Sequence, residues 1–119
     1  MDIQKIKRDD TYSIQFSFER DGKEVGWAFL VIVQTPRHDE PHGIIENVYV
    51  EQEYRGQGIG SVLTKAAIQE AKDLGCYKLL CQSRYGKEDV HEMYMRYGFK
   101  DHGKNFRMDL IDSEIKQRD

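Results

Sequence analysis

Residues 45–60 read Ile45-Glu46-Asn47-Val48-Tyr49-Val50-Glu51-Gln52-Glu53-Tyr54-Arg55-Gly56-Gln57-Gly58-Ile59-Gly60, and this stretch decides the fold. It begins as an apolar strand, continues as a glycine-rich turn and then enters a segment with the three-and-four apolar spacing of a helix buried along one side. The apolar positions of that segment are Val62, Leu63, Ala66, Ala67, Ala71 and Leu74. Gly75 is well placed to end the helix. We therefore predict a strand over 44–50, followed by a turn and a helix that begins at Ile59.

The glycine-rich turn, which covers Arg55 to Ser61, is suited to hold a phosphate or pyrophosphate. A turn that opens a helix aims unpaired backbone N–H groups and the positive end of the helix dipole at one point. The glycines at 56, 58 and 60 remove side chains that would keep a ligand from the backbone, and Arg55 adds a positive charge that can pair with phosphate oxygens. The same glycines fit a second interpretation, in which they serve only the geometry of a tight strand-to-helix connection.

Two widespread phosphate-binding motifs do not fit this turn. A Walker phosphate loop requires Gly-Lys-Ser/Thr four residues after a glycine, and the turn has no such sequence. A dinucleotide fingerprint reads Gly-x-Gly-x-x-Gly, whereas this turn reads Gly-x-Gly-x-Gly. The β-hairpin expected before the turn is also wrong for a dinucleotide-binding fold.

The residues before this stretch predict a β-hairpin. Residues 12–19 alternate between apolar and polar side chains, which is typical of an amphipathic strand. Asp21-Gly22 supplies a pair that tolerates positive φ, and 25–34 follows as a second, more apolar strand. A loop that contains both prolines, 35–43, then leads to the strand over 44–50.

The residues after the helix predict a further strand, helix and strand. A short strand is expected over 77–82, and a second helix with Asp89 as its N-cap is expected to end at Gly98. Two short strands are expected near 99–101 and 106–110. We therefore predict an α/β fold with a mixed sheet, in which an antiparallel hairpin is followed by strand-helix-strand-helix-strand with parallel pairing across each helical crossover.

Composition restricts the classes of protein to which the chain can belong. With 119 residues, of which 39% are hydrophobic and 33% charged, the chain suits one core, so we predict a single domain over 1–119 with a frayed tail over 112–119. No run approaches the roughly 20 apolar residues of a membrane span, and the first residues lack the pattern of a secretory signal, so we expect a cytoplasmic protein. A net charge of −3 argues against binding to nucleic acid.

Neither the cysteines nor the histidines have the spacing of a metal site. Cys76 and Cys81 lie five residues apart, which fits neither a redox pair nor a zinc half-site, so we interpret them as free thiols. His38 and His42 flank two acidic residues, but Pro41 prevents a regular helix that would place both imidazoles on one face. We predict that the protein binds no metal.

The glycine-rich turn resembles the signature of a known family. Arg55-Gly56-Gln57-Gly58-Ile59-Gly60 fits the Gln/Arg-x-x-Gly-x-Gly/Ala signature of GNAT acetyltransferases, and Val48-Tyr49-Val50 lies where their fourth strand offers backbone groups to pantetheine. A second segment, from His91 to Phe99, resembles the family's tyrosine-x-x-x-glycine-phenylalanine segment. The two motifs occur in the family's order, and the resemblance covers roughly residues 22–110. The segments Ile45-Glu46-Asn47-Val48 and Gly75-Cys76-Tyr77-Lys78 also resemble the branch of the family that contains glucosamine-phosphate acetyltransferases.

The resemblance implies the acyl-CoA N-acyltransferase fold and acetyl-CoA as the acetyl donor. It implies that the pyrophosphate lies on the glycine-rich turn and that the thioester lies near the fourth strand, where a backbone N–H near Tyr49 polarises its carbonyl if the strand carries a β-bulge. The implied cofactor-binding residues are Val48, Tyr49, Val50, Arg55, Gly56, Gln57, Gly58, Ile59, Gly60 and Ser61. In this family the amine attacks the thioester directly, so the enzyme removes a proton from an ammonium and supplies one to the departing thiolate.

Two residues occupy the positions at which the family carries its acid and base. Glu46 lies four residues before Val50, where the related sugar-phosphate enzymes carry a glutamate, so we predict that it is the general base. A solvated or salt-bridged strand carboxylate is an equal alternative. Tyr94 lies four residues before Gly98-Phe99, where the family places the hydroxyl that approaches the CoA sulfur, so we predict that it is the general acid. On helical spacing alone, Tyr94 would instead be a core aromatic residue.

The sequence departs from the family's pattern in two places. Only about ten residues precede Tyr12, whereas the family usually has one or two helices between its first two strands that wall the acceptor site. We hypothesise that a partner subunit of a homodimer supplies this wall. Lys87 stands where many relatives carry an asparagine that touches pantetheine. These departures keep open a second class of function, a non-catalytic acyl-CoA-binding sensor or scaffold. A nucleotide-binding domain is a third alternative.

Overall fold

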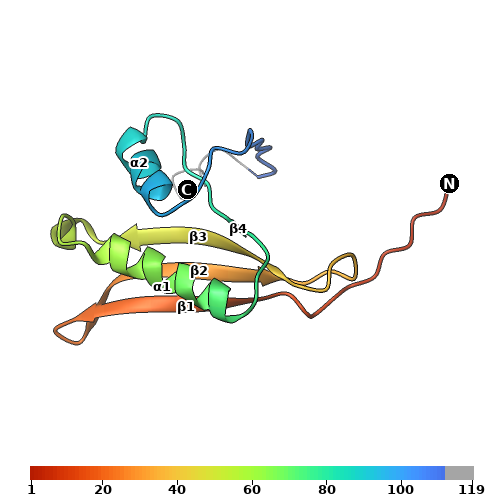
Figure 1. Cartoon of the computed structure of the whole chain (residues 1–119), viewed down its shortest axis with the longest axis horizontal. Coiled ribbons are helices and arrows are strands. Elements are labelled where there is room, and N and C mark those ends of the chain that lie inside the picture. Colours follow the sequence, from red (N-terminus) through yellow and green to blue (C-terminus); the bar gives the residue numbers. More distant parts are fainter. Residues whose placement is uncertain (112–119) are drawn as a thin grey trace. The chain divides into compact units, whose positions relative to one another are not determined.

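The computed structural model describes residues 1–111, and Figure 1 shows their helices and strands. The chain forms two compact units, residues 1–82 and the part that begins at Ser83, and each is described by itself. The tail that we predict to fray, 112–119, lies outside the described residues. None of the helices formed by residues 1–111 has the length and the apolar character that crossing a membrane requires.

The first unit is built on a four-stranded sheet in the order β1-β2-β3-β4. β1 (Tyr12–Arg20) and β2 (Lys23–Val33) form the predicted antiparallel hairpin, and both residues of Asp21-Gly22 at its tip have positive φ. β3 (His42–Val50) lies antiparallel to β2, and β4 (Leu79–Leu80) lies parallel to β3. The predicted third strand and the parallel crossover after it are therefore confirmed.

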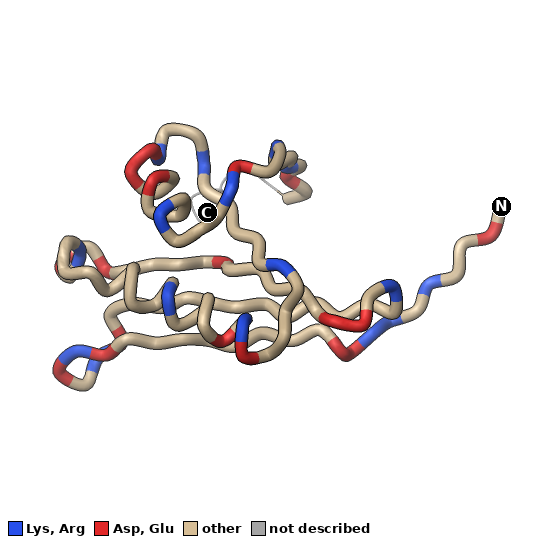
Figure 2. Tube along the Cα trace, in the orientation of Figure 1, with Lys and Arg blue, Asp and Glu red and all other residues tan. Residues whose placement is uncertain are grey.

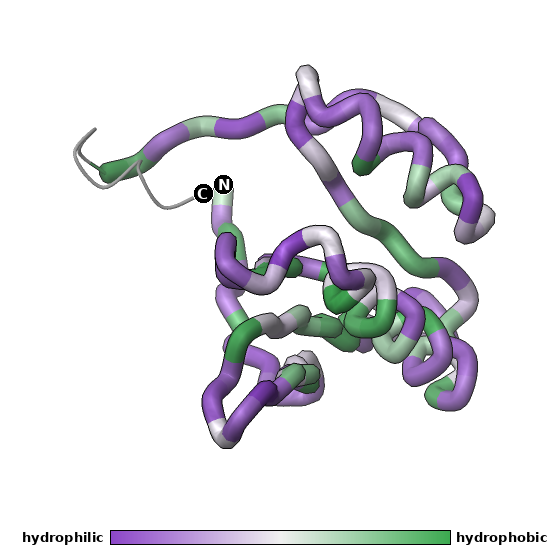
Figure 3. Tube along the Cα trace, turned by 90° about the vertical axis from the view of Figure 1, so that its left-hand side faces the viewer, coloured by the Kyte–Doolittle hydropathy of each residue, from purple (hydrophilic) through white to green (hydrophobic). Residues whose placement is uncertain are grey.

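Helix α1 (Ile59–Asp73) covers one face of this sheet (Figure 1). Its apolar stripe packs on the alternate residues of β2 and β3 that point toward it, and Figure 3 colours these hydrophobic stretches green. The buried hydrophobic residues are Val25, Ala28, Leu30, Ile32, Ile45, Ile59, Leu63, Ala67 and Ala71. Gly26 allows the close approach of helix and sheet, because a Cβ there would stand 3.1 Å from Ile59 Cγ2 and 3.2 Å from Leu63 Cδ1.

Leu30 tests the packing of this core, because its side chain is fully buried within β2. Leu30→Ala should lower the free energy of unfolding by about 3 kcal/mol, the usual cost of removing a buried leucine side chain and leaving a cavity. Val62→Ala, on the exposed side of α1, is the control and should change it by about 0.5 kcal/mol or less. Urea denaturation of both variants measures the difference, and equal losses would contradict the packing.

The described part of the second unit contains helix α2 (Glu88–Arg96), which confirms the second predicted helix. Asp89 is not its N-cap as predicted. The cap position is Lys87, and Asp89 lies in the first turn, where a carboxylate complements the helix dipole. Gly98 has a φ of +105°, and the N–H of Phe99 donates back to a helix carbonyl at 3.1 Å, so the helix ends as predicted.

The two strands predicted after α2 are absent from the described residues. Residues 99–101 and 106–110 pair with no described strand, and the apolar side chains of the second segment are exposed. An alternating pattern does not make a strand by itself, because a strand needs a hydrogen-bonded neighbour and a packed face. The predicted α/β class with a mixed sheet is correct, but the prediction of a final strand after α2 is wrong for the described residues.

Candidate active site

β3 and β4 pair over two residues and then separate. Pairing with β4 covers only Gly43 and Ile44 of β3, so the strand predicted over 77–82 is shorter than expected. β3 continues to Val50, and within residues 1–82 no strand pairs with its outer edge beyond Ile44. Backbone groups on a free strand edge can hydrogen-bond an extended ligand. This free edge of β3 is the first part of the candidate site.

A β-bulge interrupts β3 where it pairs with β2, within the stretch whose other edge is free. Ala28 of β2 faces two residues of β3, Asn47 and Val48, instead of one. Asn47 has a φ of +53°, a conformation that asparagine adopts more readily than most residues. The β-bulge on which thioester polarisation near Tyr49 depends is therefore present. It arises from the register between β2 and β3, which cannot be read from the sequence of one strand.

The bulge also decides which side chains face away from α1. Before it, Ile45 is buried in the core, and after it Val48 and Val50 pack against the core. Glu46 and Tyr49 therefore both point to the opposite face of the sheet. Without the extra residue, strict alternation would turn one of the two toward the core.

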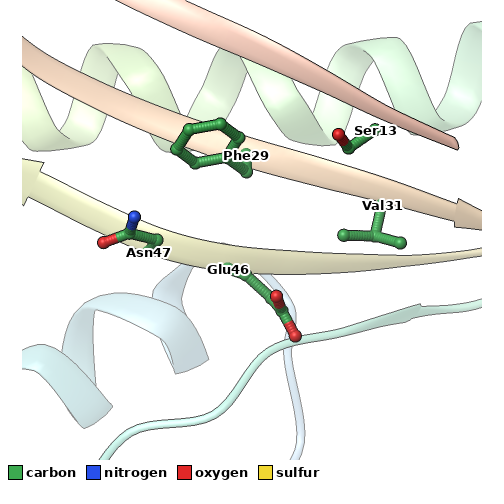
Figure 4. Close-up of a pocket in the computed structure, with 5 residues that line it drawn as sticks. All are labelled: Ser13, Phe29, Val31, Glu46 and Asn47. Atoms are coloured by element: carbon green, nitrogen blue, oxygen red, sulfur yellow. The ribbon is translucent and has the colours of Figure 1, made fainter. Parts of the chain in front are cut away.

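Glu46 lines a shallow hollow on the face of the sheet opposite α1 (Figure 4). The hollow has a volume of about 220 Å³, and its other lining residues are Ser13, Phe29, Val31 and Asn47. Ligand pockets commonly enclose about 300–1,000 Å³, so a hollow of this size holds one end of a ligand rather than a whole one. The structure thus places the predicted base on an open surface that a bound amine can reach.

The glycine-rich turn connects β3 to α1 after a short 3-10 helix, η1 (Gln52–Tyr54). Gly56 and Gly58 have φ values of +83° and +84°, in the region that other residues rarely adopt, so these glycines serve the geometry of the turn. A Cβ built on either glycine would meet nothing within 4 Å, so the space beside the backbone is open. No side chain caps the N-terminus of α1. The geometric and the phosphate-binding interpretations of the turn are therefore compatible.

The predicted cofactor-binding residues differ in what they can offer a ligand. The side chains of Val48 and Val50 pack against the core, and that of Ile59 is buried in it, so these three residues can contribute only their backbone groups. Gly60 and Ser61 lie in the first turn of α1, where backbone N–H groups point beyond the N-terminal end of the helix, toward the position of a ligand bound at the turn.

Two arginines flank the turn. The Nε of Arg55 donates to the carbonyl of Val50 at 2.7 Å, and its guanidinium lies 5.2 Å from the ring centre of Tyr49, so Arg55 folds back along β3. The Nη1 of Arg20 donates to the side-chain carbonyl of Gln57 at 3.2 Å. Arg20 was not predicted to belong to the site. The one signal in the sequence was that Arg20 stands just before the hairpin tip. The hairpin brings this tip to the end of the sheet at which β3 also ends.

The two thiols are free, as predicted, and they are poor nucleophiles. Burial raises the pKa of Cys81 to about 11 and also raises the pKa of Cys76, so both thiols stay protonated near neutral pH.

Burial, with the nearby charges of Lys78 and His38, lowers the pKa of His42. Among residues 1–111, no three His, Cys, Asp or Glu side chains come together in a way that could hold a metal ion.

Tyr94 belongs to the second unit and is described apart from Glu46 and the turn. Its ring is half-buried and meets the ring of Phe99 edge to face, with 5.6 Å between ring centres. This contact is the one expected of a core aromatic residue. Lys87, at the N-cap of α2, makes no side-chain capping hydrogen bond. The role of Tyr94 as an acid stays a prediction.

A mixed sheet whose parallel strands separate beside a glycine-rich helix start is the architecture expected of an acyl-CoA N-acyltransferase fold. The chain belongs to the acetyltransferase (GNAT) family, whose model matches residues 2–99. Members of this family use acetyl-CoA as the acetyl donor. The family and the fold class inferred from the sequence are thereby confirmed.

Relatives of the chain are named for different acetyl acceptors. A glucosamine 6-phosphate N-acetyltransferase from Trypanosoma brucei brucei is 33% identical over 80% of this chain and 63% of its own length. An aminoglycoside N(6')-acetyltransferase type 1 from Stenotrophomonas maltophilia is 31% identical over 76% of this chain and 62% of its own length. A crystal structure of a Trypanosoma brucei acetyltransferase matches with a TM-score of 0.70 and 32% identity, covering 84% of this chain and 69% of that one. The chain thus spans just under two thirds of the length of the two curated relatives.

Proposed function

We propose that the protein is an N-acetyltransferase that moves the acetyl group of acetyl-CoA to a primary amine of a small molecule or peptide by direct attack. The observation that carries this proposal is the free edge of β3, which leads through the glycine-rich turn into the uncapped start of α1. An extended amide-bearing arm suits the first feature and a pyrophosphate suits the second. CoA combines both groups in one molecule.

The residues of the first unit fit the parts of acetyl-CoA. Backbone N–H groups between Arg55 and Ser61 would hold the pyrophosphate, and the open space beside the two glycines of positive φ supports that assignment. The free edge over 48–50 would hold the pantetheine arm. Arg20 adds a positive charge at the same turn, because it is hydrogen-bonded to the neutral side chain of Gln57. When bound, acetyl-CoA supplies the thioester carbonyl that the amine attacks.

In the proposed reaction, Glu46 accepts a proton and Tyr94 donates one. Glu46 accepts a proton from the ammonium, directly or through water, and leaves a neutral amine. The amine nitrogen forms a bond to the acetyl carbon as the carbon–sulfur bond breaks, and a backbone N–H beside the bulge at Asn47 stabilises the charge on the carbonyl oxygen. Tyr94 donates its hydroxyl proton to the departing thiolate, the nitrogen releases its second proton to water as the amide forms, and the Tyr94 phenolate regains a proton from water. The protonated thiols of Cys76 and Cys81 agree with a route that has no acetylated cysteine.

Release of free CoA in the presence of amines tests the proposed function. We expect acetyl-CoA-dependent thiol release with at least one class among simple amines, amino sugars and peptides. Thermal stabilisation by acetyl-CoA without release on any acceptor would instead support an acyl-CoA sensor or scaffold. Stronger stabilisation by NAD or ATP than by CoA would support a nucleotide-binding domain.

Gly58→Ala tests the turn as the cofactor cradle. Because Gly58 has a φ of +84°, an alanine there should cost about 1–2 kcal/mol of folding free energy, and it should also raise the Kd of acetyl-CoA about tenfold by placing a methyl group beside the phosphates. Gly75→Ala is a matched control, since Gly75 has a φ of +76° at the other end of the same helix. Urea denaturation and isothermal titration calorimetry measure the two effects. An unchanged Kd in Gly58→Ala would remove the turn from the cofactor site.

The remaining expectations about partners and location stay predictions. They are a homodimer, a cytoplasmic location, and no nucleic-acid or membrane partner. Light scattering at working concentration tests the first of them, and a monomer would count against a wall supplied by a partner subunit.

A further inference from the structure

The chain after α2 carries a short apolar segment, residues 106–110, whose side chains are exposed. These residues form no helix or strand, and Figure 2 shows charges of both signs along the part of the chain that follows α2. The side chains of Phe106, Met108 and Leu110 are 87%, 80% and 83% exposed. Large apolar side chains that are exposed together mark a surface that contacts another molecule.

The two residues between these apolar side chains carry opposite charges. The Nε of Arg107 donates to Oδ1 of Asp109 at 2.8 Å, so these two side chains point to the same side of the segment. Apolar and charged residues therefore alternate with the period of a β-strand, and the positive charge precedes the negative one along the chain. Within residues 1–111, no strand pairs with this segment.

The order of these five residues is complementary to itself when two copies run antiparallel. If Met108 lies opposite the partner subunit's Met108, then Phe106 lies opposite the partner's Leu110. In the same register, Arg107 lies opposite Asp109 of the partner subunit, and the pair occurs twice about a twofold axis. Apolar pairs then share one face of the two strands and opposite-charge pairs share the other, and both kinds of cross-strand pair are stabilising.

Other registers of the same segment bring unlike or repelling residues together. An antiparallel shift of two residues places Arg107 opposite the partner's Arg107 in one direction, and Asp109 opposite the partner's Asp109 in the other. A shift of one residue places apolar side chains opposite charged ones. A parallel pair in register sets like charges side by side. Charge and apolar pattern therefore agree on one antiparallel register, centred on Met108.

We infer that two copies of the chain associate through residues 106–110, which pair as antiparallel strands with Met108 on the twofold axis. A second copy is the partner that fits, because only a twofold pair requires a sequence that complements itself. This association gives the predicted homodimer a surface and does not require acetyl transfer. Five paired residues bury much less than the roughly 1,600 Å² of a standard interface, so we expect a weak dimer with a Kd on the order of 10–100 µM.

Sedimentation equilibrium of the full chain, at concentrations on both sides of this Kd, measures the association. Arg107→Glu places a carboxylate opposite Asp109 of the partner subunit, and we expect it to weaken the dimer about tenfold. Asp109→Lys places an ammonium opposite the partner's Arg107 and should have an effect of similar size. Arg37→Glu makes the first charge change in an exposed loop of the first unit, so it is the control and should leave the Kd within about twofold.

An equimolar mixture of Arg107→Glu and Asp109→Lys tests whether these contacts form between two chains. In a mixed pair the two introduced charges face each other, and the native arginine of one copy faces the native aspartate of the other. We therefore expect the mixture to dimerise with a Kd within about threefold of the wild type, although each variant alone is about tenfold weaker. A contact within one chain cannot produce this recovery.

Three results would each overturn the inference. They are a wild type that stays monomeric at every concentration, a dimer whose Kd neither charge change alters, and a mixture that associates no more tightly than its components. A dimer that is insensitive to both changes would assign the association to another surface, such as the free edge of β3. Each of these results leaves the proposed function intact, because residues 106–110 are not assigned to the acetyl-CoA or amine site.

Discussion

Glu46→Gln should lower kcat for acetyl transfer by at least about a hundredfold while the Kd of acetyl-CoA changes by less than about twofold. The amide keeps the size and the strand position of Glu46, which is exposed in the hollow beside Phe29, but it cannot accept the proton of the ammonium. The remaining activity should rise with pH, because a larger fraction of the amine is then already neutral in solution. Steady-state rates across pH, with calorimetry for acetyl-CoA, measure both effects.

A loss of one negative charge on the same unit needs its own control. Glu53→Gln, an exposed residue of η1, removes the same charge and should leave kcat within about twofold of the wild type. If Glu46→Gln keeps the full rate at neutral pH, Glu46 is only a solvated strand carboxylate. If Glu53→Gln loses as much activity, the loss of rate in Glu46→Gln comes from a change in the electrostatic field of the protein rather than from the loss of a base.

Tyr94→Phe should lower kcat by about tenfold to a hundredfold and leave the Kd of acetyl-CoA unchanged. Phenylalanine keeps the edge-to-face contact with Phe99 at 5.6 Å, so the fold of the second unit should be retained, while the hydroxyl that protonates the thiolate is lost. Rates and Kd values measured on the same preparation separate the chemical step from binding. A wild-type rate would assign Tyr94 to packing alone.

Tyr97→Phe is the matched control for the loss of the hydroxyl. Tyr97 follows α2 at its C-cap, and its ring is also half-buried, so this change removes a phenol from the same unit. We expect it to retain activity within about threefold. Equal losses in the two variants would point to a general disturbance of the helix rather than to an acid at Tyr94.

The strand, turn and helix around residues 45–60 could be predicted because each is decided by local sequence. The change of apolar period marks α1, and the left-handed backbone at Gly56 and Gly58 needs glycine whatever the rest of the chain does. The hairpin follows from the alternation in β1 and the positive φ of Asp21-Gly22. These are the elements for which propensity, pattern and tertiary packing agree.

Other features depend on residues far apart in the chain and were therefore missed or wrong. The bulge at Asn47 exists because Ala28 of β2 pairs against two residues of β3, a fact of register that no single strand displays. Arg20 reaches the turn through Gln57, which lies 37 residues later. The strands predicted near 99–101 and 106–110 need a pairing partner that the described residues do not supply.

The most direct test follows the acetyl group itself. The chain is incubated with acetyl-CoA labelled with ¹³C at the acetyl carbonyl and with spermidine, neamine, glucosamine or glucosamine 6-phosphate, and the carbonyl signal is followed by NMR. We predict that the label passes from the thioester to an amide of an amine acceptor, with one free CoA thiol formed for each amide, and that Glu46→Gln slows this passage. A label that stays in the thioester with every acceptor, while acetyl-CoA remains bound, would contradict acetyl transfer by this chain.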